Sequence, residues 1–119
     1  MSQTIQSDDD FVQLLQKFFK VSSKKFDGLQ LLRLDKIGNS YFFDTYSVSS
    51  DQIHSGRIDV AGDFFCDCIG FVTHRTVCRH VLFGLYNLGV QFGMGILKEV
   101  LRKHSLGSRG YEVYVNGQS

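Results

Sequence analysis

The residues that could do chemistry in this chain lie close together in the sequence. The segment FFCDCIGFVTHRTVCRHVLFGLYNLG, residues 64–89, contains all three cysteines and two of the four histidines among the 119 residues. Four of these residues form a CxC pair followed by a CxH pair: Cys66, Cys68, Cys78 and His80. Three thiolates and one imidazole are a ligand set typical of structural zinc. We therefore predict one structural zinc ion per chain, held by these four residues.

The local geometry of each pair supports this ligand set. In an extended strand, residues two apart point to the same side, so Cys66 and Cys68 can direct both sulfurs at one ion. In a helix such residues lie on nearly opposite faces, which places Cys78 just before or at the first helical position and His80 in the first turn. A helix N-terminus also favours the thiolate of Cys78, the form that binds metal. Four protein ligands leave no open position for a catalytic water.

Other interpretations of these residues remain open from the sequence alone. His74 lies in the loop between the two pairs and could replace His80 as the fourth ligand. Three buried thiols without metal, or a redox-active CxC pair, are also possible, although neither accounts for the CxH pair that follows. His54 lies in a polar segment and is expected to be solvated, whereas His104 is expected to cap a helix end.

The elements that must position the ligands can be predicted from hydrophobic periodicity. Apolar residues three and four positions apart predict an amphipathic helix from Asp8 to about Ser22 and two later helices over 81–92 and 94–104. Aromatic and β-branched residues predict strands at the following positions: 41–48, 57–60, 63–68 and 111–117. A polar loop is expected at 49–56, and the leucine-rich segment LQLLRLDKIGN has no clear period. The predicted fold class is α+β, with a small antiparallel meander and helices.

Composition bounds the class of protein. Hydrophobic residues make up 43% and charged residues 21%, and the net charge of +1 gives no sign of a strongly basic polyanion-binding protein. We expect one domain over 1–119, divided into an N-terminal segment (1–38), a zinc-binding unit (39–92) and a C-terminal segment (93–119). The start MSQTIQSDDDF lacks the pattern of a signal peptide, and no apolar run is long enough to span a membrane. We expect an intracellular protein, nuclear if eukaryotic.

Several residues could contact partners, but none suggests catalysis. A basic cluster around the first helix could meet phosphates or an acidic partner, or form a solvated face. Its members are Lys17, Lys20, Lys24 and Lys25. Near the ligands, Arg75 and Arg79 could hydrogen-bond to the thiolates or face a partner, and Phe71 and Phe83 could contact a partner. Because no catalytic constellation is present, we expect neither an enzyme nor a small-molecule substrate.

The CxC and CxH pairs, placed after a β-hairpin and opening an apolar helix, resemble the SWIM-type zinc finger. The segment CRHVLFGLYNLG is similar to the helix of that family, which usually begins with C[KR]H and continues with aliphatic residues. The resemblance covers about residues 41–92. It implies that Cys66, Cys68, Cys78 and His80 bind zinc within a ββα unit.

In size and order of elements, the chain further resembles the small SWIM-domain recombination mediators of the Shu complex. Those proteins pair with RecA-family recombinase paralogues and promote filament assembly. The resemblance implies an adaptor for DNA repair by homologous recombination, which binds such a paralogue and reaches DNA mainly through the complex. One position departs from the pattern, because Phe83 stands where that group usually has alanine.

The alternative is direct nucleic-acid binding, by a standalone regulator or a transposon-like SWIM factor. The basic face of the first helix favours this interpretation, as does the charge of residues 66–104, which carry five Lys or Arg against two Asp or Glu.

Overall fold

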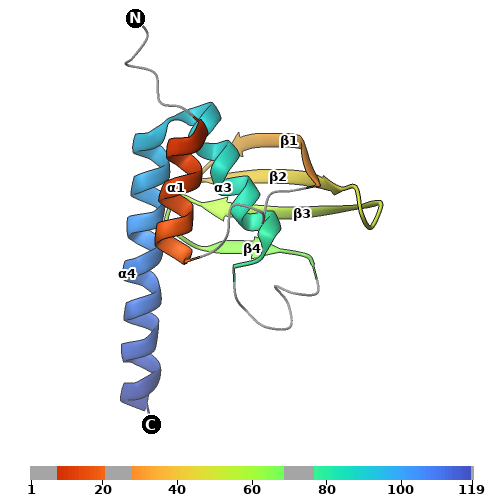
Figure 1. Cartoon of the computed structure of the whole chain (residues 1–119). Coiled ribbons are helices and arrows are strands. Elements are labelled where there is room, and N and C mark those ends of the chain that lie inside the picture. The colour runs from red at the N-terminus through yellow and green to blue at the C-terminus, as the bar shows by residue number, and fades with distance from the viewer. Residues whose placement is uncertain (1–7, 21–27, 69–76, 119) are drawn as a thin grey trace, which may run out of the picture.

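The computed structural model describes residues 8–20, 28–68 and 77–118, and it has three layers (Figure 1). A four-stranded sheet forms the first layer, helix α3 the second, and helices α1 and α4 both pack against α3 as the third. The elements are α1 (Asp8–Phe19), β1 (Leu29–Ile37), β2 (Ser40–Ser47), β3 (Gln52–Asp59), β4 (Phe64–Cys66), α3 (Arg79–Phe92) and α4 (Met94–Gln118). The α+β prediction is confirmed: the sheet is an antiparallel meander, and three helices accompany it.

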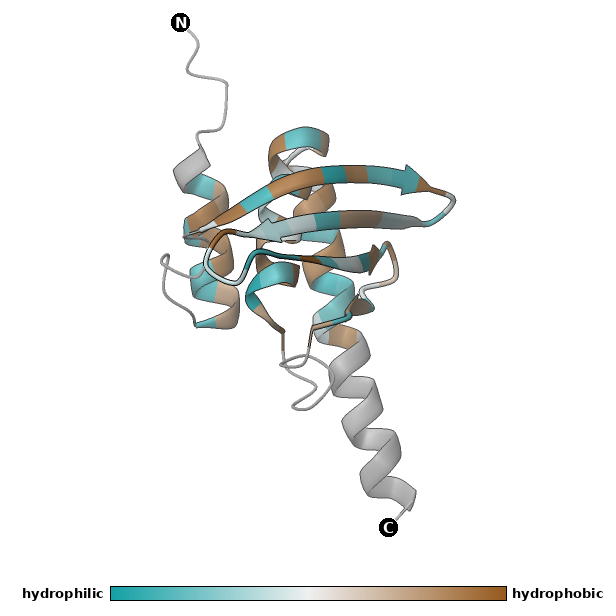
Figure 2. Ribbon diagram, turned by 90° about the vertical axis from the view of Figure 1, so that its right-hand side faces the viewer, coloured by the Kyte–Doolittle hydropathy of each residue, from teal (hydrophilic) through white to brown (hydrophobic). Residues whose placement is uncertain are grey.

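The sheet has the order β1-β2-β3-β4, so each strand pairs with its neighbour in the chain. Along β2 the side chains alternate between buried and half-buried positions, and the buried set includes Tyr41, Phe43 and Thr45. Alternation of this kind is typical of a sheet with one face packed on the core. Figure 2 shows the same alternation of hydrophobic and hydrophilic residues along the strands. The register also places Gly56 of β3 opposite Cys66 of β4.

Two features of the hairpins differ from the sequence predictions. The leucine-rich segment is strand β1, and β3 begins at Gln52, so the prediction of a polar loop over 49–56 was wrong. The turn is shorter than expected because Asp51 adopts a φ of 53°, which lets Ser47 pair directly with Gln52. Polar residues were mistaken for a loop, although backbone pairing in a strand does not require apolar side chains.

The helices also end at different places than predicted. Helix α1 stops at Phe19, and Lys20 takes a left-handed φ of 58°. Helix α4 continues to Gln118, so the short C-terminal strand predicted over 111–117 was wrong. Strand propensity acts through pairing with a neighbouring strand. The segment follows an established helix instead, and extending a helix is easier than starting a new element.

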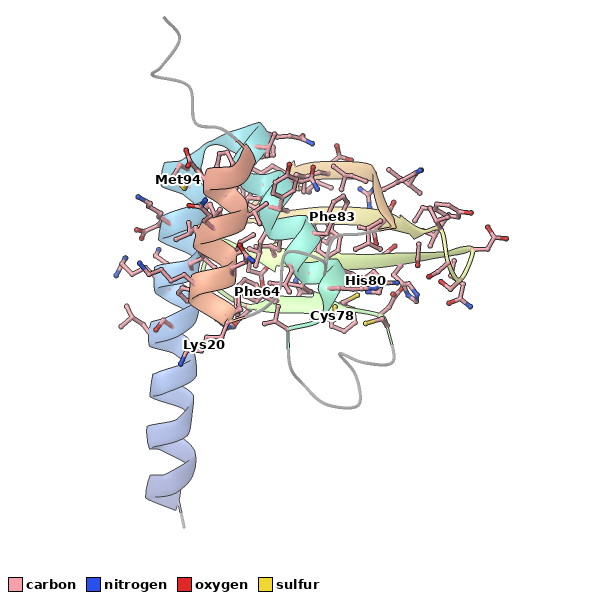
Figure 3. All side chains as sticks on the ribbon, viewed as in Figure 1. Lys20, Phe64, Cys78, His80, Phe83 and Met94 are labelled. Carbon is pink, nitrogen blue, oxygen red and sulfur yellow. The ribbon has the colours of Figure 1, made fainter. Side chains whose placement is uncertain are left out.

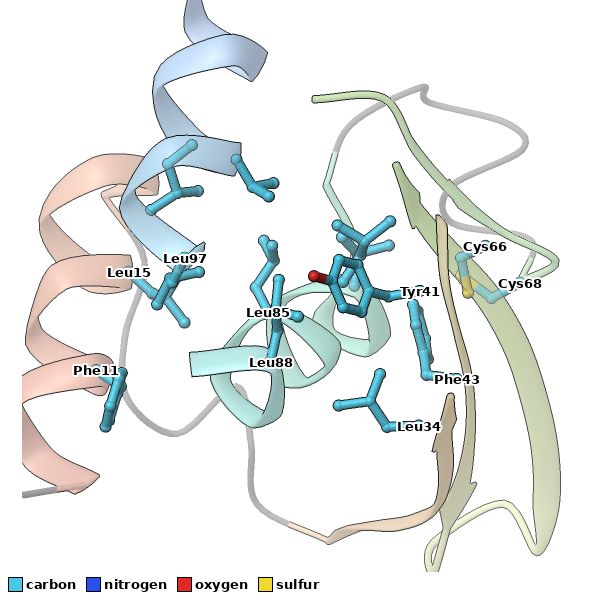
Figure 4. Close-up of a cluster of buried hydrophobic side chains, with 14 residues drawn as sticks. Phe11, Leu15, Leu34, Tyr41, Phe43, Cys66, Cys68, Leu85, Leu88 and Leu97 are labelled. Carbon is cyan, nitrogen blue, oxygen red and sulfur yellow. The ribbon is translucent and has the colours of Figure 1, made fainter. Parts of the chain in front are cut away.

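The core lies between the sheet and the three helices, and Figure 4 shows its members around α3. Helix α3 is buried along most of the side predicted from its periodicity, with Val81, Leu82, Leu85 and Leu88 at most 1% exposed; Phe92, expected on the same side, is 39% exposed at the end of the helix. Helices α1 and α4 complete the core with the following buried residues: Phe11, Leu15, Leu97, Val100 and Leu101. No described helix is long and apolar enough to cross a membrane.

Helix α4 is fixed to the sheet through the turn between β3 and β4. His104 Nδ1 lies 2.8 Å from the carbonyl oxygen of Gly62, and its ring stacks on Phe64 at 4.2 Å between centroids. His104 therefore lies within α4 and contacts the turn, so the prediction that it caps a helix end was wrong. A Cβ at Gly62 would lie 2.4 Å from the backbone nitrogen of His104.

Substituting Gly62 by alanine is therefore expected to lower the free energy of unfolding by at least 2 to 3 kcal/mol, roughly the sum of the strain at φ 98° and the overpacking. Gly38→Ala is the matched control, because Gly38 also has a positive φ but its Cβ would meet no atom within 4 Å. Urea titration of both variants measures the difference. Equal losses would show that contact with α4 contributes nothing at Gly62.

Candidate metal centre

The four predicted ligands come together where β4 ends and α3 begins. Cys66 is the last residue of β4, and Cys68 follows two positions later. Cys78 is the N-cap of α3, with extended backbone angles of −86° and 170°, and His80 lies in the first turn. The predicted placement of Cys78 and His80 at the helix start is thus confirmed. Figure 3 shows these two side chains next to each other at this end of α3.

The distances and burial of the cluster suit a metal ion such as zinc. One ligand atom from each of the four residues lies within 4.8 Å of all the others. Tetrahedral zinc with Zn–S bonds of about 2.3 Å requires its sulfurs to lie about 3.8 Å apart, so only small side-chain shifts are needed. Cys66, Cys68 and His80 are at most 6% exposed, and Cys78 is half-buried. The residues present therefore fit the ion.

The imidazole of His80 gives a second indication of a metal. Both of its ring nitrogens are buried, and neither makes a hydrogen bond of normal geometry with another described residue. A buried polar group without a partner is costly, so such groups are rare in folded proteins. A metal ion bound between His80 and the three sulfurs would provide one of the missing partners. His80 also lies within the cluster, which supports its choice as the fourth ligand; His74 falls outside the described residues.

The surroundings shift the pKa values of two of the three thiols in opposite directions. The pKa of Cys78 is lowered to about 4, first because the Cys66 side chain hydrogen-bonds to it and further by the neighbouring His80 side chain and the backbone N–H of Val81. The Val81 group belongs to the first turn of α3, and the expected effect of the helix N-terminus on Cys78 stays a prediction, because the largest cause of the lowered pKa is Cys66. The pKa of Cys66 is raised by the same hydrogen bond and by burial. Metal binding would draw off the remaining protons, because the bound form of cysteine is the thiolate.

Backbone and side-chain contacts hold the ligands in place. Cys78 O accepts a hydrogen bond from Leu82 N at 3.0 Å, which starts the helical ladder. Arg79 donates from Nη2 to Ser47 Oγ at 2.9 Å, and this bond ties the start of α3 to the buried end of β2. Arg79 thus has a clear role in anchoring the helix. Arg75 and Phe71, the other contact residues predicted near it, lie outside the described residues.

Sequence reasoning missed one neighbour of the site. His54 was expected to be solvated, but it lies on β3 with its ring centroid 4.5 Å from that of His80. Its Nδ1 is 3.1 Å from Oδ1 of Asp67, the residue between the first two cysteine ligands. The position of Asp67 in the CxC pair was visible in the sequence. Its contact with His54 depends on the register of β3 and β4, which no local signal revealed.

The remaining candidate contact residues lie apart from the cluster. Phe83 is half-buried on α3 and stacks on Tyr86 with 6.1 Å between ring centroids. Lys17 and Lys20 are exposed on and just after α1, and Figure 3 places Lys20 far from Cys78. The other two residues of the predicted basic cluster, Lys24 and Lys25, lie outside the described residues.

The chain matches no family model, no curated protein and no solved structure. Four protein side chains fill a tetrahedral set, so a bound ion would have no position left for a substrate or an activated water. A closed site of this kind stabilises a fold.

Proposed function

We propose that this chain is a non-enzymatic adaptor, stabilised by one structural zinc ion, that binds a protein partner and helps it act on DNA in homologous recombination. The observation that carries the proposal is the buried Cys3His cluster at the junction of β4 and α3. Its order along the chain, CxC followed by CxH at the start of an apolar helix, is that of the SWIM-type zinc finger. By this resemblance, the partner is a RecA-family recombinase paralogue.

The surface supports a protein partner. Ten large apolar side chains of the described residues are exposed, with exposed fractions of 37% to 60%. They are Phe18, Leu32, Ile37, Val48, Ile53, Phe65, Val90, Phe92, Ile96 and Leu106. The aromatic members of this set, Phe18, Phe65 and Phe92, are of a type enriched at protein interfaces. Phe65 lies next to the first zinc ligand, so a partner could contact the zinc-binding unit directly.

The charge of the chain argues against strong DNA binding by the chain alone. Its formal net charge is +1, and a zinc ion with three thiolates would lower that value to about zero. Affinity for DNA comes largely from neutralised phosphates, each of which releases counterions. Direct DNA binding, through a regulator or transposon-like role, remains the second candidate because Lys17 and Lys20 are exposed.

We expect the isolated chain to bind DNA only weakly in a gel-shift titration, and tight binding to appear only when its protein partner is present. Affinity purification of the tagged chain, followed by mass spectrometry, is expected to identify a recombinase paralogue. The charge reversal Lys17→Glu with Lys20→Glu is expected to leave capture of that protein unchanged. The same substitutions should weaken DNA binding only if the lysines contact DNA.

Two salt concentrations separate the candidates. Direct binding to phosphates must weaken by about one power of salt concentration per contact. Nanomolar, salt-sensitive binding by the chain alone, lost in the Lys17→Glu with Lys20→Glu variant, would contradict the adaptor proposal and favour the direct DNA binder. Purification without any recombinase-family protein would argue against the proposed partner.

A further inference from the structure

Asp67, which lies between two zinc ligands in the sequence, is joined to β3 by three polar contacts. Its Oδ1 is 3.1 Å from Nδ1 of His54 and 3.2 Å from the backbone nitrogen of Ser55. Its own backbone nitrogen donates to Ser55 O at 3.1 Å. Because a carboxylate only accepts hydrogen bonds, the proton between the side chains belongs to His54 Nδ1. The carboxylate therefore fixes the orientation of the His54 ring.

The His54 ring in turn packs on His80. The two ring centroids are 4.5 Å apart, and the planes are inclined by 42°. The side chain of His54 is 22% exposed, whereas His80 is only 6% exposed. The more exposed ring thus covers part of the more buried one.

Packing matters here because His80 lacks the usual alternative. A histidine that binds metal normally donates its other ring N–H to a carboxylate or carbonyl, and this bond fixes the orientation of the ring. Neither nitrogen of His80 makes such a bond with a described residue. Among the described residues, the His54 ring packs against the His80 ring and limits its rotation.

We propose that His54, held by Asp67, is a positioning residue for the zinc site: it orients the His80 imidazole toward the ion and slows release of the ion. The proposal rests on the zinc site of the proposed function, but not on any partner or on DNA. Residues that hydrogen-bond to metal ligands typically change metal affinity about 10- to 100-fold when they are mutated, and we take the same range for a ring that holds its ligand by packing. An effect of that size is expected on zinc release.

The test measures transfer of zinc from the full-length protein to a chromophoric chelator. His54→Ala and Asp67→Ala are each expected to speed release about 10- to 100-fold. Asp67→Asn keeps an oxygen acceptor for His54 Nδ1 and should stay close to the original rate. The double variant His54→Ala with Asp67→Ala should release zinc no faster than His54→Ala, since the two residues act as one unit.

The control is Asp51→Asn, which removes the negative charge of a side chain that accepts a hydrogen bond from Tyr46 at the turn between β2 and β3, while asparagine tolerates the left-handed φ of this position. This variant should release zinc at the original rate. The cobalt-substituted protein gives a second measurement, because its visible absorption reports the ligand geometry. His54→Ala is expected to shift that spectrum, whereas a general loss of stability would leave the spectrum of the folded protein unchanged. If His54→Ala does not fold, His54→Phe keeps a ring but loses the contact with Asp67, and it should release zinc about as fast as Asp67→Ala.

The outcomes that would overturn the proposal differ from failure of the site itself. One outcome is that the original protein holds one zinc ion and that all the His54 and Asp67 variants release it as slowly as the original protein does. In that case the positioning role is wrong and the zinc site stands. If the original protein folds without zinc, the site and the positioning role both fail. Additive effects in the double variant would show that His54 and Asp67 act independently, which also contradicts the proposal.

Discussion

Replacing Cys66 by alanine is expected to abolish tight zinc binding and to lower the melting temperature sharply. Cys66 is fully buried, and its sulfur belongs to a cluster that spans at most 4.8 Å. Structural zinc contributes on the order of 10 kcal/mol of binding free energy in small fingers, so losing one of four ligands removes a large part of the stability. Metal analysis of the purified variant and thermal unfolding measure the two effects.

Loss of zinc must be distinguished from a general loss of stability. Val100→Ala is a suitable control because Val100 is 2% exposed on α4 and belongs to no ligand cluster. This variant should be less stable but still hold one zinc ion. In the original protein, a chelator should increase amide exchange in residues 64–90. An unchanged zinc content and melting temperature in Cys66→Ala would refute the zinc site, and unchanged amide exchange would show that the ion does not support the fold.

The second large effect is expected at Phe43, in the middle of the sheet. Its ring is fully buried and lies against two glycines, since a Cβ at Gly56 or Gly84 would come within 2.3 or 3.0 Å of it. Phe43→Ala should therefore lower the free energy of unfolding by about 3 to 5 kcal/mol, because glycines cannot extend to fill the cavity. For a domain whose total stability is typically about 5 to 15 kcal/mol, this is a severe loss.

Phe42→Ala is the matched control for Phe43→Ala. Phe42 is the preceding residue on β2, but it points to the opposite face of the sheet and is half-buried. Its truncation should cost clearly less in the same urea titration. Comparable losses of unfolding free energy in the two variants would show that burial of Phe43 against the two glycines adds nothing to stability.

The ligands and the helices that carry them could be predicted because their signals are local. The spacing of Cys78 and His80 requires a helix start, and the periodicity of Val81, Leu82 and Leu85 shows which side of that helix is buried. Both follow from the geometry of a single element. No pairing between distant segments had to be known.

The contacts that were missed all depend on distant pairing. His54 meets Asp67 only because β3 and β4 pair in one register, and His104 meets Gly62 only because α4 crosses the turn before β4. The start of β3 was also missed, since its polar residues resemble a loop until their partner strand is known. A register is set by the hydrophobic pattern and the turn geometry, and the polar start of β3 displays no such pattern.

The meander order of the sheet has a consequence for how the chain folds. Each strand pairs with the next, and the four metal ligands lie within fifteen residues of one another. Closing short loops costs little chain entropy, and proteins with mostly local contacts fold faster than those with distant pairings. If the Cys3His cluster binds a metal ion, the ligands from β4 to the start of α3 can meet that ion before β1 or α4 is in place. Docking of α4 on the turn at Gly62 joins residues 42 positions apart, so it closes a longer loop and costs more chain entropy.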